Sequence, residues 1–184
     1  MEGIILKIVQ AIWYILPAYL ANMSPVFAKK LFSGFSTPVD FGRKFGGSPL
    51  FGRNKTYRGL ISGTVVGILV ALLQQYLYRF NSIQKISLVN YHNINIIGFG
   101  IYMGFGALIG DLAKSFIKRR IGIAPGKSWI PFDQTDFLVG AMIMSSLIYV
   151  PDLLTILYVL IILPILKVIV DQIGVFLKIH DARL

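Results

Sequence analysis

Cysteine is absent from this 184-residue sequence, and histidine occurs only twice, at His92 and His180. Disulfide bonds and thiolate metal sites are therefore excluded, and so is a metal centre built from several histidines. Charged residues are also scarce, at 14% of the chain against about 25% in a typical soluble domain. Because 55% of the residues are hydrophobic, a core of this length cannot hide the apolar surface from water, so lipid must cover much of it.

Acidic residues are the rarer charged type, with eight against eighteen basic residues and a formal net charge of +10. This balance favours polyanionic partners such as nucleotides and phospholipid headgroups. We expect no nucleic acid partner, because most of the surface lies in the membrane. The first hydrophobic stretch lacks a charged leading region and a small-residue cleavage site, so we interpret it as a retained helix and not a signal peptide.

Five hydrophobic stretches cover about residues 3–23, 60–78, 94–112, 137–150 and 153–177. A helix needs roughly 20 residues to cross the hydrocarbon layer, and all but the fourth stretch reach that length. The fourth requires residues 129–136 to enter the membrane border, or local thinning of the bilayer. The sequence therefore predicts one all-α domain over residues 1–184, a polytopic integral membrane protein with about five transmembrane helices and two cytoplasmic loops that form the active site.

The long connections 27–59 and 113–136 are predicted to lie on the same side as the C-terminus. That side has fourteen Lys and Arg residues (seven, five and two in these three segments), whereas the other side has three. The positive-inside rule places the basic loops in the cytoplasm and the N-terminus outside. Part of the excess can serve phosphate binding instead of topology. Glycines spaced four apart, at Gly100 and Gly104 and at Gly106 and Gly110, favour close helix packing and leave a homodimer open.

Three carboxylates are expected at one membrane border: Asp111 ends the third stretch, and Asp133 and Asp136 open the fourth span. Three carboxylates at one depth suit a hard cation such as Mg²⁺, held together with substrate phosphates. A helix N-cap is the alternative role for Asp136. Asp171 lies four residues from Lys167 on one helix face, which favours an intramembrane ion pair or a place in the wall of the active-site cavity.

Basic residues follow Asp111 directly. Lys114 and Lys118 are four apart and share a helix face, and for Lys118 and Arg119 phosphate binding competes with an interfacial role. Arg120 is expected to belong to the interfacial positive cluster.

A second set of phosphate donors precedes the second hydrophobic stretch, in the segment 52–59. It contains Lys55, Thr56 and Arg58 between glycines, immediately before a helix N-terminus that adds backbone N–H donors. The segment is not a P-loop, because G-x-x-x-x-G-K-[ST] is absent, and G-x-G-x-x-G is missing from it too.

Basic loops, a carboxylate cluster and apolar helices at one border indicate that a water-soluble phosphate compound meets a membrane substrate. Nucleotidyl transfer requires charge neutralisation and alignment more than covalent help from the protein. A lipid phosphate would attack the α-phosphate of a nucleotide, and pyrophosphate would leave. The attacking phosphate is already ionised at neutral pH, so no general base is required.

These motifs resemble the membrane cytidylyltransferases of the CDP-diacylglycerol synthase family. That family has Gly-Asp-Leu, then S-x(n)-K-R and P-G-H-G-G-x-x-D-R-x-D; this chain has Gly110-Asp111-Leu112, Ser115, Lys118-Arg119, Pro131 and Asp133-Gln134-Thr135-Asp136. An upstream K-K-T-W-E-G element is matched by Asn54-Lys55-Thr56-Tyr57-Arg58-Gly59. The missing G-H-G-G and the short chain are similar to the archaeal branch, the CDP-archaeol synthases, as are Pro-Phe-Asp-Gln-x-Asp and the early segment from Pro17 to Val26.

The resemblance implies that CTP and an unsaturated archaeal glycerol-diether phosphate give the CDP-lipid and pyrophosphate with Mg²⁺. It implies metal ligands at Asp111, Asp133 and Asp136, which with Lys118 form the catalytic set. The substrate-binding positions it implies are Asn22, Lys55, Thr56, Arg58, Lys114, Ser115, Arg119 and Gln134. Ether-lipid specificity comes from the resemblance alone, since no side chain distinguishes ether from ester.

Two alternative functions have weaker support in the sequence. A CDP-alcohol phosphatidyltransferase would need a D-G-x-x-A-R motif, which the sequence lacks. A small transporter or scaffold would leave Asp111, Asp133 and Asp136 without a shared purpose, because an ion-coupled carrier keeps its acids near the bilayer midplane.

Overall fold

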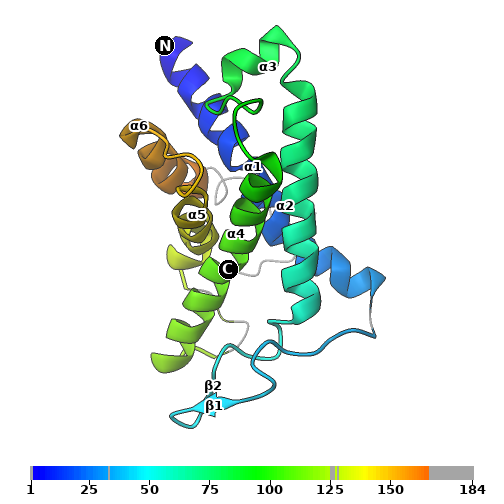
Figure 1. Cartoon of the computed structure of the whole chain (residues 1–184). Helices are drawn as coiled ribbons and strands as arrows, with labels where there is room; N and C mark the ends of the chain where they lie inside the picture. Colours follow the sequence, from blue (N-terminus) through cyan, green and yellow to red (C-terminus); the bar gives the residue numbers. More distant parts are fainter. Residues whose placement is uncertain (1, 33, 125–126, 128, 166–184) are drawn as a thin grey trace, which may run out of the picture.

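The chain forms a bundle of long helices in the computed structural model, which describes residues 2–32, 34–124, 127 and 129–165 (Figure 1). A two-stranded hairpin and an isolated β-bridge between Pro38 and Thr56 depart from the predicted all-α fold among these residues. The elements, in chain order, are α1 Glu2–Leu31, β1 Lys44–Phe45, β2 Ser48–Pro49, α2 Tyr57–Leu77, α3 Asn81–Ile86, α4 Ile96–Arg120, α5 Phe132–Ser145, α6 Leu153–Leu157 and the π-helical turn η1 Tyr158–Ile162.

Three of the helices are long and apolar enough to cross a membrane: Gly3–Leu31, Tyr57–Leu77 and Ile96–Arg120. They correspond to the first three predicted stretches. The fourth stretch belongs to α5, which begins at Phe132, close to the start expected at Asp133 and Asp136, and ends at Ser145, before the predicted end at Val150. The last predicted span begins as an apolar helix at Leu153–Ile165. Lys167 and Asp171 lie outside the described residues, so their pairing stays a prediction.

Glycines bring α4 into backbone contact with a helix on each side, as their spacing predicted. On the α2 side, a Cβ on Gly67 would lie 2.6 Å from the carbonyl oxygen of Gly100 and 2.8 Å from the Cα of Gly104. On the α5 side, a Cβ on Gly140 would lie 2.7 Å from the amide nitrogen of Gly110. Neither contact leaves room for a side chain, so α4 is the central helix and α2 and α5 are fixed against it.

The two ends of the bundle differ in their connections (Figure 1). One end has α3 and the irregular segment 87–95, together with an exposed ion pair in which the Lys7 Nζ lies 3.3 Å from the Asp152 Oδ2. Asp152 also caps α6 by accepting hydrogen bonds from the amide and hydroxyl of Thr155 at 3.0 and 2.9 Å. The other end has the connection between α1 and α2, with its β1–β2 hairpin, and the turn from α4 into α5.

Asp40 organises the connection between α1 and α2. Its carboxylate is buried and accepts hydrogen bonds from the amides of Gly42, Phe51 and Gly52 at 2.9, 3.0 and 3.2 Å. Burial alone would raise the pKa of Asp40, but these amide donors outweigh it and hold the pKa below its ordinary value. Gly42 and Gly52 have φ angles of 76° and 105°, a backbone region that glycine adopts readily. The hairpin therefore folds back around one aspartate.

Candidate active site

Lys114 is the centre of a buried ionic cluster between α4 and α5. Its ammonium nitrogen lies 3.1 Å from the Asp111 Oδ1, 2.9 Å from the Asp133 Oδ1 and 2.8 Å from the Asp136 Oδ2. Asp111 precedes Lys114 by three residues on α4, so the two share a helix face. The sequence predicted that the three carboxylates lie together, and the structure brings all three to one lysine.

Asp133 and Asp136 both reach Lys114 because they are three residues apart near the start of α5. The alternative role of Asp136 as an N-cap is wrong: α5 begins at Phe132 with Pro131 at the cap position, so Asp136 is inside the helix. Asp133 also receives the Lys118 Nζ, which lies 3.0 Å from each of its carboxylate oxygens. The predicted shared face of Lys114 and Lys118 is thus confirmed.

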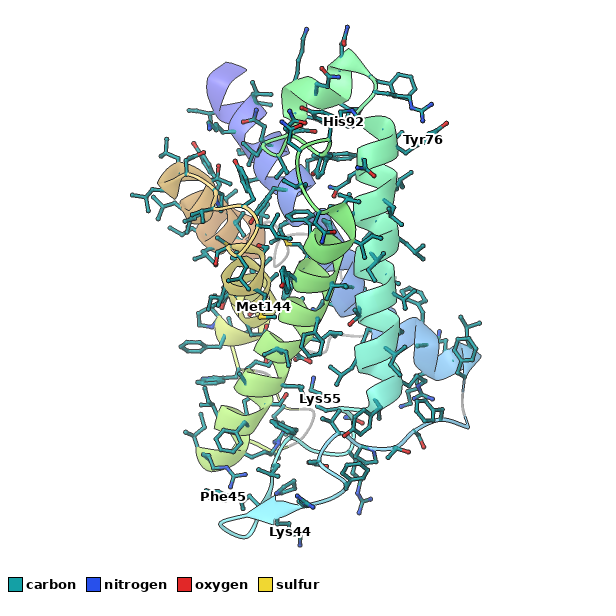
Figure 2. The ribbon with its side chains drawn as sticks, viewed as in Figure 1. Lys44, Phe45, Lys55, Tyr76, His92 and Met144 are labelled. Atoms are coloured by element: carbon teal, nitrogen blue, oxygen red, sulfur yellow. The ribbon has the colours of Figure 1, made fainter. Side chains whose placement is uncertain are left out.

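Lys55 joins the α1–α2 connection to this cluster through an ion pair with Asp111. Figure 2 shows Lys55 at the lower ends of α2 and α4. The next residue, Thr56, is the N-cap of α2, and its side-chain oxygen accepts a hydrogen bond from the amide of Gly59 at 3.3 Å. A cavity of about 50 Å³ lies here, lined by residues that include Asn54, Lys55, Thr56 and Asp111. The two basic segments therefore meet at one site, as the sequence predicted.

The cluster is electrically balanced, with three carboxylates and three ammonium groups from Asp111, Asp133, Asp136, Lys55, Lys114 and Lys118. The exposed fractions of these side chains range from 6% for Asp136 to 26% for Lys55. Charges buried to this extent are tolerated only when each has a partner of opposite sign. Each group of the cluster therefore has a partner of opposite charge within the protein, at the point where the α1–α2 connection meets α4.

The oxygen donors suit a hard cation, although a lysine occupies their meeting point. Among the described residues, no three acidic or histidine side chains surround a point that is free for a metal ion. The reason is that the ammonium of Lys114 lies between Asp111, Asp133 and Asp136. Carboxylates are the ligand type that Mg²⁺ prefers, so the donor atoms have the right chemistry for the predicted ion, while the ammonium of Lys114 fills the point on which they converge.

Three other predicted site residues lie on the two helices that form the cluster, Ser115 and Arg119 on α4 and Gln134 on α5. Ser115 is buried, and its hydroxyl donates to the Asp111 carbonyl at 2.8 Å. Arg119 donates to the Ile123 carbonyl and packs beside Gly52 of the connection. Gln134 is buried, and its Oε1 has no hydrogen-bond partner among the described residues.

Two further predicted residues lie on neighbouring helices. Asn22 is half-buried on α1, one turn after Tyr19, whose ring contacts Phe137 of α5 with centroids 5.5 Å apart. Arg58 is buried but does not line the cavity beside Lys55; it lines a separate groove between α1 and α2. The structure thus separates Arg58 from the other phosphate donors of its segment.

Sequence reasoning missed the role of Arg120, which was assigned to the interfacial positive cluster. Its guanidinium lies 5.1 Å from the centroid of the Phe45 ring and 4.8 Å from that of Phe116. It also donates hydrogen bonds to the carbonyls of Phe45 and Pro49, the latter at 2.7 Å. Arg120 therefore fastens the β1–β2 hairpin to the end of α4. Arg120 stands in a run of basic residues, and nothing in that run predicts a contact with the hairpin.

Comparison with known proteins identifies the relatives of this chain. A family model described as CarS-like CDP-archaeol synthase matches residues 4–183. The CDP-archaeol synthase of Pyrococcus furiosus is 35% identical over 161 residues, which cover 86% of this chain and 87% of the relative. That of Methanocaldococcus jannaschii is 40% identical over 139 residues, covering 75% of each chain.

A solved structure is also similar. It is described as an intramembrane enzyme for archaeal membrane lipid biosynthesis, and it superposes with a TM-score of 0.68 at 30% sequence identity. The match covers 88% of this chain and 92% of the other. The helical arrangement in Figure 1 is thus shared with a membrane-embedded enzyme.

Proposed function

This chain belongs to the CDP-archaeol synthase family, and we propose that its ionic cluster transfers CMP from CTP to an unsaturated archaeal glycerol-diether phosphate. The chain is a membrane-embedded enzyme of the cytidylyltransferase class. The products are the CDP-lipid and pyrophosphate. The observation that carries the proposal is the convergence of Asp111, Asp133 and Asp136 on Lys114, at the place where Lys55 joins the α1–α2 connection to α4.

Lysines bind the phosphates of CTP in the proposed mechanism. Lys55, Lys114 and Lys118 each have an ammonium group already desolvated beside a carboxylate, so a triphosphate can take the place of the carboxylate as partner. Asp111, Asp133 and Asp136 would then hold Mg²⁺, which supplies charge neutralisation for the phosphates and the departing pyrophosphate. Each buried charge keeps a partner of opposite sign in both the free and the bound enzyme.

The transfer needs no protein base. An oxygen of the lipid phosphate attacks the α-phosphorus of CTP, a new P–O–P bond forms, and the bond between the α- and β-phosphates breaks. Pyrophosphate leaves with the electron pair. The chain's contribution is alignment and charge compensation by Lys55, Lys114 and Lys118, together with partial exclusion of water from a cluster that is at most about one quarter exposed.

The reaction is tested with purified protein in detergent, labelled CTP, Mg²⁺ and the unsaturated diether phosphate. We expect labelled CDP-lipid and pyrophosphate in equal amounts, and loss of both when the divalent cation is chelated. A folded protein that forms no CDP-lipid under these conditions would contradict the proposal. Activity that persists in full without a divalent cation would remove Mg²⁺ from it.

We also propose that the end with the ionic cluster faces the cytoplasm and the N-terminus faces outside. The support is the excess of basic residues in the connections at that end and the location of CTP in the cytoplasm. A cysteine introduced at Asn54 is the only thiol in the chain, which has no natural cysteine. It should react with a membrane-impermeant reagent only from the cytoplasmic side; labelling from outside would invert the orientation.

A further inference from the structure

A large apolar groove lies between the second half of α1 and the first half of α2. Its volume is about 770 Å³, within the range of roughly 300–1,000 Å³ that is usual for ligand sites. Its walls are almost entirely hydrocarbon, including Leu20, Met23 and Phe27 from α1, Phe35 from the connection, and Ile61 and Val65 from α2. Both helices are membrane-span candidates, so this groove belongs to the part of the molecule that is in contact with lipid.

One charged residue, Arg58, lines this otherwise apolar groove. The side chain is only 8% exposed, and one guanidinium nitrogen donates to the Phe32 carbonyl just after the end of α1. The Nε is buried and has no hydrogen-bond partner among the described residues, and none of their ion pairs includes Arg58. A buried guanidinium without a carboxylate is costly unless an anion joins it.

The first turn of α2 separates this groove from the ionic cluster. Lys55, just before α2, contacts Asp111, whereas Arg58, three residues later, lines the groove. α1 and α2 approach closely here: a Cβ on Gly59 would lie 3.3 Å from the Pro25 Cβ. A molecule with an apolar tail in the groove and an anionic head at Arg58 would have its head three residues along the chain from Lys55 of the ionic cluster.

We propose that this groove binds a hydrocarbon chain of the lipid-phosphate substrate, and that Arg58 attracts its phosphate to the end of the groove nearest the ionic cluster. The inference rests on the proposed function for the identity of the anionic head. A nucleotide does not fit walls of this composition, and an uncharged lipid or a purely apolar protein surface would leave Arg58 without its anion. Arg58 is then a residue for the lipid substrate and not for CTP.

Photolabelling tests the occupant directly. The lipid phosphate carries a diazirine in its hydrocarbon chain, is irradiated with the purified enzyme in detergent, and the labelled peptides are found by mass spectrometry. We expect adducts on the segments that contain Met23, Phe27 and Val65. The matched control is the same diether with a free alcohol in place of the phosphate, which should label these segments at least several-fold less. Equal labelling by both compounds would show that bulk lipid fills the groove and would overturn the proposal.

Two matched variants give a kinetic test. Val65→Phe narrows the groove, whereas Leu69→Phe adds the same ring one turn further along α2, at an exposed residue outside the groove. Displacing one or two methylenes of the lipid should raise the KM for lipid roughly four- to fifteenfold in Val65→Phe, because each buried methylene contributes about 0.8 kcal/mol. Leu69→Phe should match the wild type, and CTP affinity should be unchanged in both, which also reports correct folding.

Arg58→Gln supplies the charge test. It should raise the KM for lipid phosphate and abolish the preference of the groove for the phosphate compound over the alcohol, without weakening CTP binding. A weaker affinity for CTP with unchanged lipid KM would assign Arg58 to the nucleotide instead.

Two outcomes distinguish the proposed function from the proposed groove. If the wild type makes no CDP-lipid but the phosphate-dependent labelling persists, the proposed function fails and the proposal for the groove stands. If CDP-lipid forms and Val65→Phe equals Leu69→Phe, the groove fails and the function stands.

Discussion

The two ends of the bundle use lysine and aspartate in opposite ways. At one end Lys7 and Asp152 form a single pair, 3.3 Å apart, with side chains 36% and 47% exposed. At the other end Lys114 alone contacts three aspartates, with a side chain only 13% exposed. Water solvates the first pair whether or not it forms, whereas the second cluster has exchanged water for protein partners. Burial, and not residue type, distinguishes a surface contact from a site prepared for charged substrates.

The largest effect expected is on turnover. Asp133→Asn removes a charge that both Lys114 and Lys118 contact, and we expect CDP-lipid formation to fall by roughly 10²–10³, as when one preorganised electrostatic contact of an active site is removed. Asp152→Asn changes the same atoms at the opposite end and should leave the rate unchanged. The measurement is the initial rate per amount of folded protein. Near-normal turnover of Asp133→Asn would exclude that residue from the metal site.

Lys114→Met should produce the largest loss of stability. It leaves three carboxylates facing one another without their shared cation, and breaking a buried pair in this way costs about 3–5 kcal/mol. The free energy of unfolding is measured in detergent micelles by denaturant titration. Addition of Mg²⁺ should restore more stability to the variant than it adds to the wild type, because the ion replaces the missing ammonium. A variant with wild-type stability would mean that the cluster is solvated like the opposite end.

Asp152→Ala should have a smaller effect, about 0.5–2 kcal/mol, because it removes the N-cap of α6. Asp152→Asn keeps a capping oxygen and serves as the control. The amide and hydroxyl of Thr155 hold the pKa of Asp152 below its ordinary value. The contribution of this carboxylate is therefore present above the pKa of the unfolded chain and is lost as pH falls through the lower folded value. The difference between wild type and Asp152→Ala should narrow in acid; a constant difference would contradict the cap.

Lys7→Met should have the smallest effect, under about 1 kcal/mol, because exposed ion pairs contribute little. The same denaturant titration measures it, at low and at high salt. Any small destabilisation should disappear at high salt, where exposed charges are screened. A loss as large as that of Lys114→Met would erase the distinction between the two ends.

The sequence predicted the meeting of the two basic segments because the geometry is constrained by the membrane. Hydrophobic stretches long enough to cross a bilayer force connections separated by two spans to the same side. Lys55 and Asp111 are 56 residues apart, yet this rule alone puts them at one border, and the ion pair follows. Helix periodicity then accounts for Asp111, Lys114 and Lys118 on one face of α4. The glycine spacing of α4 likewise predicted close helix packing, and the structure adds that it occurs on two sides, against α2 and α5.

Other features depend on contacts that no local pattern encodes. α5 begins at Phe132, so Asp136 lies in the helix interior and not at the cap, and its carboxylate contacts Lys114 of α4. Arg120 and Asp40 act through carbonyls and amides of a connection whose path is irregular. Arg58 lies in the first turn of α2 and Lys55 just before that helix, and the sequence of the segment does not specify that the two side chains line different cavities.

The contact between Gly110 and α5 ties the geometry of the ionic cluster to the distance between α4 and α5. Gly110 directly precedes Asp111, and the atoms nearest to its missing Cβ belong to the backbone of Asp136. Asp111 and Asp136 are thus positioned by a direct contact between two main chains, and the side chain that bridges their carboxylates is that of Lys114. A methyl group at position 110 would push α4 and α5 apart and so lengthen the contact between Lys114 on α4 and Asp136 on α5.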